Sequence, residues 1–494
     1  MLHTDKTTGS TTDFCELDPS RRAFLKRSGQ LALAGTALPF ALNLAAMGEA
    51  AAFDATDYKA LVCVFMYGGN DYANTVVTYD DPSYNAYSTI RGGGAGQTAG
   101  GIALAKADLT PTLLTPTVPL PGGRQYALHP AMTGLAGLFN AGQAAVQLNV
   151  GPLVAPLTKA QYSNADRKTY PLPPKLFSHN DQQSIWQSSS PEGSTIGWGG
   201  NVGDVALPSN SNALFTCISV TGNAVFLSGD TALSYQVSSG GAVAINAVKN
   251  NVYNSAAVKT AMSTLVQQTR THTLENEYNK VTSRAVGAEA QVTSALAGVT
   301  LGTAFPANNS LADQLKTVAK LIGARSSLGA KRQVFLVSIG GFDTHDNLIA
   351  LHPVLLGKVS DALTAFYKAT VEMGVANKVT AFTASDFGRT LTSNGDGSDH
   401  GWGSHHFVVG GAVKGKAFYG NAPPVSVGST AAAGDQQHVG QGRLLPSTAV
   451  DQYAATLASW LGVADAELPG ILPNLKRFGA SAGRPDYPVN LGFV

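Results

Sequence analysis

Aspartate and histidine side chains gather in four short polar loops of this 494-residue sequence. Three of the loops directly follow apolar segments, and these loops contain Asp71, Asp343 and Asp386. His345 shares the second loop, and His400 lies in the fourth. Carboxylates and imidazoles are the usual ligands of divalent metals in hydrolytic sites, where an ion polarises an oxyanion or stabilises the leaving oxygen. The residue types therefore predict metal-assisted hydrolysis.

Buried strands must bring these loops together. The segments 60–67, 334–339 and 379–384 are apolar throughout, which is typical of strands that are buried on both faces. A helical apolar stripe from Leu356 to Phe366 separates the last two segments, so they form a βαβ unit. We therefore predict an α/β fold with a mostly parallel sheet covered by helices on both faces. Ligands bind beyond the carboxyl ends of the strands in such sheets, so loops far apart in sequence converge there.

Weaker patterns predict the neighbouring elements. Residues 80–127 are rich in Gly, Pro, Thr and Tyr, and they predict long loops. Helical spacing covers residues 131–139, and an apolar run predicts a further strand over 144–150.

A small insertion is expected over about 213–305. Short Val, Ile and Leu runs between Gly and Ser predict a small antiparallel β section over 213–250, and helical patterns follow over 255–300. Ser310 with Asp313 resembles a capping box at the start of the next helix.

The composition excludes several classes of protein. Hydrophobic residues make up 44% of the chain and charged residues 13%, so the chain can bury a large core and is not disordered. A net charge of +1 gives no basic field for nucleic acid or an anionic membrane. Three cysteines are too few for a disulfide-built miniprotein. Cys63, in an apolar segment, is expected to be buried, and the sequence leaves open whether it pairs with Cys217.

The N-terminus has the pattern of a targeting segment. Paired arginines, Arg21 and Arg22, precede Phe-Leu-Lys and a mildly apolar run over 31–47, and small residues follow. This pattern is typical of a twin-arginine signal over 1–52, followed by a mature domain over 53–494. It implies passage through the twin-arginine translocase and a periplasmic or secreted location. The run is too short and too interrupted for a stable membrane span, and we expect none in the mature chain.

Five motifs, taken in order, resemble the signatures of a bacterial family known as domain of unknown function 1501. The motifs span 68–75, 178–183, 340–345, 385–390 and 399–403, so the resemblance covers most of the mature chain. That family is placed in the alkaline phosphatase and sulfatase superfamily. The resemblance implies an alkaline-phosphatase-like sheet and a metal-dependent site for phosphate or sulfate esters. The metal would be Zn, Mn, Mg or Ca, and the substrate an anionic ester.

The resemblance also implies roles for single residues. Asp71, Asp343, His345, Asp386 and His400 match positions that hold metal in the superfamily. The superfamily motif Ser-Asp-His-Gly reads Ser-Asp-Phe-Gly here, with Phe387 in place of the histidine, which puts a second metal in doubt.

Each of these ligands has a structural alternative. Asp71 could be a turn residue, Asp343 with His345 a loop-capping pair, and Asp386 the partner of Arg389 in a buried ion pair.

Several residues are candidates for catalysis. Ser178 precedes an expected helix over 181–187, where it could be a nucleophile or an N-cap, and Thr75 is the competing nucleophile. His179 could be a ligand, a base or a core histidine. Arg389 could hold an anionic substrate oxygen.

These motifs and candidate residues lead to two hypotheses for the function. The first is an exported metal-dependent hydrolase of phosphate or sulfate esters. The second is a relative that has lost catalysis and acts as a secreted binding or surface-assembly protein, which Phe387 and the unassigned nucleophile favour.

Overall fold

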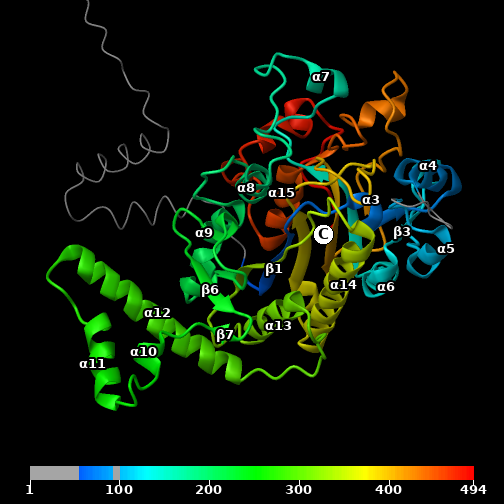
Figure 1. Ribbon diagram of the computed structural model, residues 1–494. Coiled ribbons are helices and arrows are strands. Elements are labelled where there is room, and N and C mark those ends of the chain that lie inside the picture. Colours follow the sequence, from blue (N-terminus) through cyan, green and yellow to red (C-terminus); the bar gives the residue numbers. More distant parts are fainter. Residues whose placement is uncertain (1–54, 93–100) are drawn as a thin grey trace, which may run out of the picture. The chain divides into compact units, whose positions relative to one another are not determined.

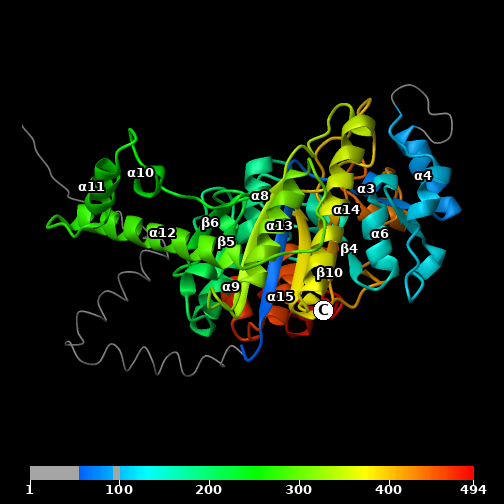
Figure 2. The ribbon, with the colours of Figure 1, turned by 90° about the horizontal axis from the view of Figure 1, so that it is seen from below.

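The computed structural model describes residues 55–92 and 101–494. The expected leader over 1–52 lies outside the described residues. The domain that follows is built on one large sheet, shown from two directions in Figures 1 and 2.

Ten strands form this sheet in the order β11-β4-β10-β9-β1-β8-β5-β6-β7, with β12 beside β4. β1 lies in the middle and pairs in parallel with both β8 and β9, while β10 runs antiparallel between β9 and β4. The predicted mostly parallel sheet is therefore confirmed. The strands are β1 Lys59–Met66, β4 Ala144–Gly151, β5 Cys217–Ser219, β6 Ser234–Ser238, β7 Gly241–Ala242, β8 Arg332–Ile339, β9 Val379–Ser385, β10 Ser404–Gly410, β11 Phe418–Tyr419 and β12 Thr448–Ala449; β2 (Val76–Thr78) and β3 (Tyr126–Leu128) pair separately.

Helices cover both faces of the sheet, as predicted (Figures 1 and 2). Alternate residues of β1, such as Val62 and Val64, share a core with α6, α13 and α14. Phe382 of β9 points to the other face, where its ring meets Trp198 and Tyr453 of α9 and α15. The helices of the two layers are α6 Thr133–Asn140, α13 Ser310–Gly323 and α14 Leu348–Glu372, and α8 His179–Ser188, α9 Trp198–Ala206 and α15 Val450–Leu461. The other α-helices of residues 55–92 and 101–494 are α3 Tyr72–Thr75, α4 Asp81–Arg91, α5 Lys106–Leu109, α7 Lys159–Ser163, α10 Asn246–Lys249, α11 Ala256–Gln267, α12 Thr273–Ala297 and α16 Leu468–Ile471.

Helix α14 has, by length and composition alone, the character of a membrane span, and no other helix of the described chain does. It packs against α13 and α6, and Leu356, Val359 and Leu363 are fully buried there. The apolar stripe is thus explained by the core of the domain.

Three expectations for local structure were wrong. Residues 80–127 are not only loops, because Asp80 caps the nitrogen of Ser83 and starts α4 with Pro82 in its first turn. Helix α13 is capped by Asn309, whose side chain accepts from the backbone nitrogen of Ala312, so Ser310 is its first residue.

The third wrong expectation is the small antiparallel β section over 213–250. β5 pairs in parallel with β8, and β6 in parallel with β5, so both extend the main sheet. Only the short β6–β7 pair is antiparallel. Strands of three to five residues carry too few side chains for their pattern to show a pairing direction. The helical patterns expected over 255–300 are confirmed as α11 and α12.

The two cysteines of the described chain are both buried and free. They lie on β1 and β5, with β8 between them. Burial raises the pKa of Cys217 to about 12, so its thiol stays protonated. The domain therefore rests on its sheet core.

Asp451, in the first turn of α15, gives the fold a pH dependence that can be tested. Its side chain is buried, and burial raises its pKa from 3.8 to about 6. Because the folded state favours the neutral carboxyl, stability is present at low pH and is lost as the pH rises from 4 to beyond 6. Asp451→Asn is neutral throughout and keeps an oxygen for the backbone nitrogen of Asn474, which donates to Asp451. We expect the variant to gain up to about 3 kcal/mol at pH 8 and nothing at pH 4.

Urea unfolding of both proteins at pH 4 and pH 8 measures this difference. An equal gain at the two pH values would show that the carboxyl is not the cause.

The sheet also explains how the polar loops meet. The loops after β1, β8 and β9 leave neighbouring parallel strands at one edge. β10 is antiparallel, so the loop before it, which contains His400, reaches the same edge.

Candidate metal centre

Three side chains bring possible metal-ligand atoms together at this edge. The ligand atoms of His179, Asp343 and His400 all lie within 4.8 Å of one another. The Nε2 atoms of the two histidines are 3.0 Å apart, and they lie 3.4 Å and 3.2 Å from the two carboxylate oxygens of Asp343. In a tetrahedral zinc site with bonds of about 2.0–2.1 Å, ligand atoms lie about 3.3 Å apart. The two nitrogens and the two carboxylate oxygens therefore have the spacing of metal ligands.

The other ring nitrogen of each histidine fixes which atom faces the centre. His400 Nδ1 lies 2.8 Å from the carbonyl oxygen of Phe177, and His179 Nδ1 lies 2.7 Å from Oδ2 of buried Asp386. Both oxygens accept, so both Nδ1 atoms donate, and each neutral ring has its lone pair on Nε2. Such carboxylate or carbonyl partners are typical of metal-ligating histidines.

Two lone pairs that face each other at 3.0 Å need a proton or a cation between them. The hydrogen bond to Asp386 raises the pKa of His179, while burial lowers the pKa of His400. A proton on His179 Nε2 satisfies the pair, and so does a divalent ion, which would also hold Asp343. The donor set of two imidazoles and one carboxylate thus fits a metal and leaves room for further ligands.

His345 lies against this group, at ligand-like distances from two of its members. Its Nε2 is 2.9 Å from Nε2 of His400 and 3.1 Å from Oδ1 of Asp343. Its Nδ1 lies 3.3 Å from the Asp399 carboxylate. The ring is 39% exposed, more than either histidine of the group, so solvent reaches it.

Arg389 holds Asp343 in place. Its Nη1 donates to Oδ1 of Asp343 at 2.7 Å and to the carbonyl of Gly68 at 3.0 Å, and Nε and Nη2 donate to the Ser398 carbonyl. Burial raises the pKa of Asp343, but the Arg389 guanidinium and the nearby histidines lower it more, so the carboxylate stays charged. The ion pair that the sequence suggested between Arg389 and Asp386 is absent from the described residues, because Arg389 pairs with Asp343.

Asp71 lies at the expected strand end but outside the group. Its Oδ2 accepts from Arg91 Nη2 at 2.7 Å and from Ser398 Oγ at 2.6 Å, and its Oδ1 caps the nitrogen of Asn74. Both side chains of the ion pair are fully buried. Burial raises the pKa of Asp71, but Arg91, together with His352 and the Ser398 hydroxyl, lowers it more, so the pKa lies below its usual range. The charge of Asp71 is therefore balanced by Arg91 of the same chain. This geometry gives no support to the metal-ligand role that the resemblance implies.

Asp386 also lies outside the group and contacts one of its members, His179. Its Oδ2 accepts from His179 and from Gln183 Nε2, at 2.7 Å and 2.8 Å. Asp386 is thus placed to orient a ligand, where the resemblance implies a ligand.

The two candidate nucleophiles have their hydroxyl groups engaged elsewhere. Ser178 is the N-cap residue of α8, and its Oγ donates to Oδ2 of Asp181 at 2.9 Å. Thr75 is fully buried, and its Oγ1 donates to the carbonyl of Asp71 at 2.7 Å. Neither hydroxyl contacts His179, Asp343 or His400 within the described part of the chain.

The Phe387 ring packs against the two histidines of the centre, and two glycines approach Phe387 and Asp343 closely. The Phe387 ring lies 4.9 Å from that of His179 and 4.7 Å from that of His400, measured between centroids. Gly69 has a φ of 81°, and a Cβ there would lie 2.4 Å from the Phe387 ring. Gly68 has a φ of 116°, and a Cβ there would lie 2.4 Å from the backbone nitrogen of Asp343. Only glycine fits at both positions.

No role was predicted from the sequence for Gln183, which contacts Asp386, or for Arg91, which pairs with Asp71. Gln183 and His179 both contact Asp386, and their spacing of four residues on a helix was a usable signal. Arg91 carried no such signal, because α4 was expected to be loop.

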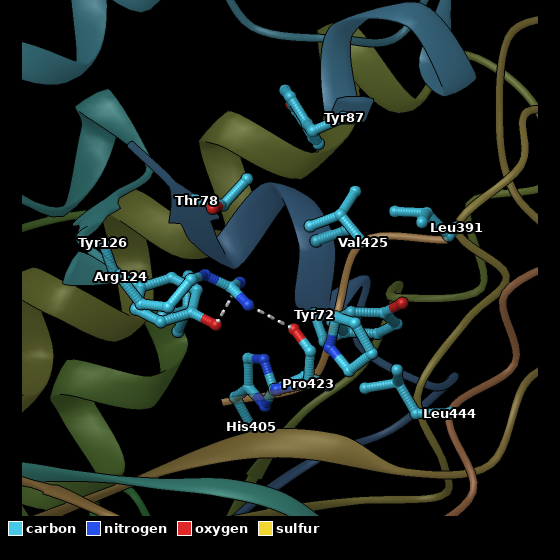
Figure 3. Close-up of a pocket in the computed structure, with 13 residues that line it drawn as sticks. Tyr72, Thr78, Tyr87, Arg124, Tyr126, Leu391, His405, Pro423, Val425 and Leu444 are labelled. Carbon is cyan, nitrogen blue, oxygen red and sulfur yellow. Dashed lines mark hydrogen bonds between the residues drawn. The ribbon is translucent and has the colours of Figure 1, made fainter. Parts of the chain in front are cut away.

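A separate small cavity of about 30 Å³ lies near α3 (Figure 3). Its wall includes Tyr72, Tyr126 and Arg124, and Arg124 donates to the Tyr126 hydroxyl and to the Pro423 carbonyl. No histidine of the metal centre lines it.

Comparisons with solved structures show a loose similarity over most of the chain. A crystal structure of Ps i-CgsB in complex with k-i-k-neocarrahexaose has 8% identity and a TM-score of 0.33, covering 85% of this chain and 77% of the other. The lipoteichoic acid synthase LtaP from Listeria monocytogenes has 10% identity and a TM-score of 0.31, covering 84% and 74%. The PsFucS1 sulfatase from Pseudoalteromonas sp. has 11% identity and a TM-score of 0.31, covering 83% and 68%.

No curated protein matches the sequence. A family model described as "Protein of unknown function (DUF1501)" matches residues 58–452, which include all of the residues of the candidate metal centre. The chain therefore belongs to this family of proteins of unknown function, as its motifs predicted.

Proposed function

We propose that this protein is an exported, metal-dependent hydrolase of phosphate or sulfate esters. The observation that carries the proposal is the convergence of His179 Nε2, His400 Nε2 and the Asp343 carboxylate, with both Nδ1 atoms fixed by acceptors. Export stays a prediction from the twin-arginine pattern at the N-terminus.

The residues of the group would hold one divalent ion. Such an ion, when bound, supplies Lewis acidity and makes water a better nucleophile at neutral pH. Arg389 keeps Asp343 charged and oriented, and Asp386 accepts from His179 Nδ1 and so holds the ring with Nε2 toward the centre. Asp71 is already neutralised by Arg91, and Phe387 stands where the superfamily motif has a histidine; both observations support a site for one ion.

His345 is the proton carrier in this proposal. With Nδ1 donating to Asp399, its Nε2 can take a proton from water and later give it to the leaving oxygen. Water is the proposed nucleophile, because the hydroxyl groups of Ser178 and Thr75 are engaged elsewhere.

Elemental analysis of the purified protein and an ester panel test this function. We expect one equivalent of metal per chain and turnover of a phosphate or sulfate ester that needs the metal. As the change of a proton carrier, His345→Gln should lower turnover by about 10²–10⁴-fold and leave the metal content unchanged. Loss of metal from this variant would instead make His345 a ligand, since its Nε2 lies 2.9 Å from that of His400. The exposed His272, at the start of α12, gives the control variant His272→Gln.

Absence of metal from a folded protein would contradict the proposal. A metal-containing protein that turns over no ester would instead favour the binding or surface-assembly function.

A further inference from the structure

Arg443 is fixed next to the candidate metal centre through the backbone of His400. Its Nε donates to the carbonyl oxygen of His400 at 2.7 Å, and its guanidinium lies 5.3 Å from the centre of the Phe177 ring. The carbonyl of Phe177 is the acceptor for His400 Nδ1. The same two residues therefore position the guanidinium and one metal ligand.

The end of this side chain has capacity left for a ligand. Both terminal nitrogens of Arg443 lack a hydrogen-bond partner among residues 55–92 and 101–494, and neither is a buried unsatisfied atom, so solvent reaches them. Burial lowers the pKa of Arg443, and nearby Asp399, the partner of His345, opposes this shift. A guanidinium anchored by Nε offers its two terminal nitrogens as a fork that matches two oxygens of an oxyanion.

The other cations near the centre are engaged. Arg389 uses Nε, Nη1 and Nη2 on Ser398, Gly68 and Asp343, and it is fully buried. Lys175 lies 3.5 Å from the Asp181 carboxylate on α8. The anion-binding role that the sequence suggested for Arg389 thus has a better-placed candidate in Arg443.

We propose that Arg443 binds a tetrahedral oxyanion, phosphate or sulfate, on the substrate beside the metal centre. This inference deepens the proposed function, because it names the residue that selects an anionic ester. The inference rests on the proposed function only in placing the reacting ester bond at the metal. The binding of an anion by Arg443 does not depend on it.

Calorimetric titration with inorganic phosphate, and separately with inorganic sulfate, tests the inference on zinc-loaded and metal-free protein. We expect the wild type to bind at least one of the two anions. Arg443→Gln should weaken that binding by about tenfold or more, because two charge-assisted hydrogen bonds are lost. Arg443→Lys should recover part of the affinity, since it keeps the charge without the fork. The preferred anion distinguishes phosphate from sulfate esters.

Arg124 provides a matched control, because it also lies over an aromatic ring, at 5.4 Å from Tyr126, and donates to a carbonyl (Figure 3). Arg124→Gln should leave anion affinity unchanged. Zinc affinity, measured against a chelator dye, should be equal in wild type and Arg443→Lys.

Each outcome decides one proposal. Unchanged anion affinity in Arg443→Gln overturns the inference, and so does a parallel loss of zinc and anion affinity in both Arg443 variants, which would mean that Arg443 only positions His400. A protein that binds no zinc overturns the proposed function, and the anion titration of the metal-free protein still decides the inference.

Discussion

Replacement of His400 by alanine is expected to lower metal affinity by more than about 100-fold, beyond the range for loss of an outer partner. The change removes one of three converging ligand atoms, whereas Asp386→Asn removes only the carboxylate that orients His179. We expect Asp386→Asn to cost about 10–100-fold. Competition between the protein and a chelating dye for zinc measures both constants.

The order of the two effects separates ligands from orienting residues. If Asp386→Asn abolishes binding and His400→Ala does not, Asp386 is the ligand and the assignment from the geometry is wrong. Circular dichroism of each variant shows whether the fold is retained, and His272→Ala controls for loss of an imidazole at the surface.

Replacement of Asp71 by alanine is expected to lower the free energy of unfolding by about 3–5 kcal/mol. The change leaves the Arg91 guanidinium charged and fully buried without its partner, and it also removes the acceptor of Ser398 Oγ and the cap of Asn74. A large loss is expected because an unpaired buried charge keeps its whole desolvation cost. Urea unfolding, followed by tryptophan fluorescence, measures the loss.

Metal content measured on the same variant decides between two roles for Asp71. We expect the metal stoichiometry of folded Asp71→Ala to equal that of the wild type. The double variant Asp71→Leu with Arg91→Met should recover part of the stability, because apolar residues of similar volume can replace a buried ion pair. Loss of one equivalent of metal with stability unchanged would make Asp71 a ligand, as the resemblance implied.

Much of the fold could be predicted because long apolar segments have few alternatives. β1 and β9 each have seven consecutive buried residues and β8 has six, and the ends of these strands were predicted to within two residues. The short strands β5 and β6 could not be placed, since three to five residues fix neither a partner nor a direction.

The site was predictable in its residue types and location, and less so in its roles. Strand order brings Asp343 and Asp386 to one edge, but the rotamers and partners decide which of them faces His179 and His400. Arg91 neutralises Asp71 from a helix that the sequence did not reveal. Whether a guanidinium or a metal ion neutralises a carboxylate depends on tertiary contacts, and no local sequence pattern encodes these contacts.

The sequence distance between the ligands couples any ion to the folding of the whole sheet. His179 and His400 are 221 residues apart, and their imidazoles meet only when β8, β9 and β10 are assembled. The unfolded chain does not hold these atoms together, so an ion that binds here binds the native state alone. At a free concentration 100 times its Kd, it would stabilise the protein by about 2.7 kcal/mol. Metal supply and chelators would then act on the lifetime of the folded protein as well as on its chemistry.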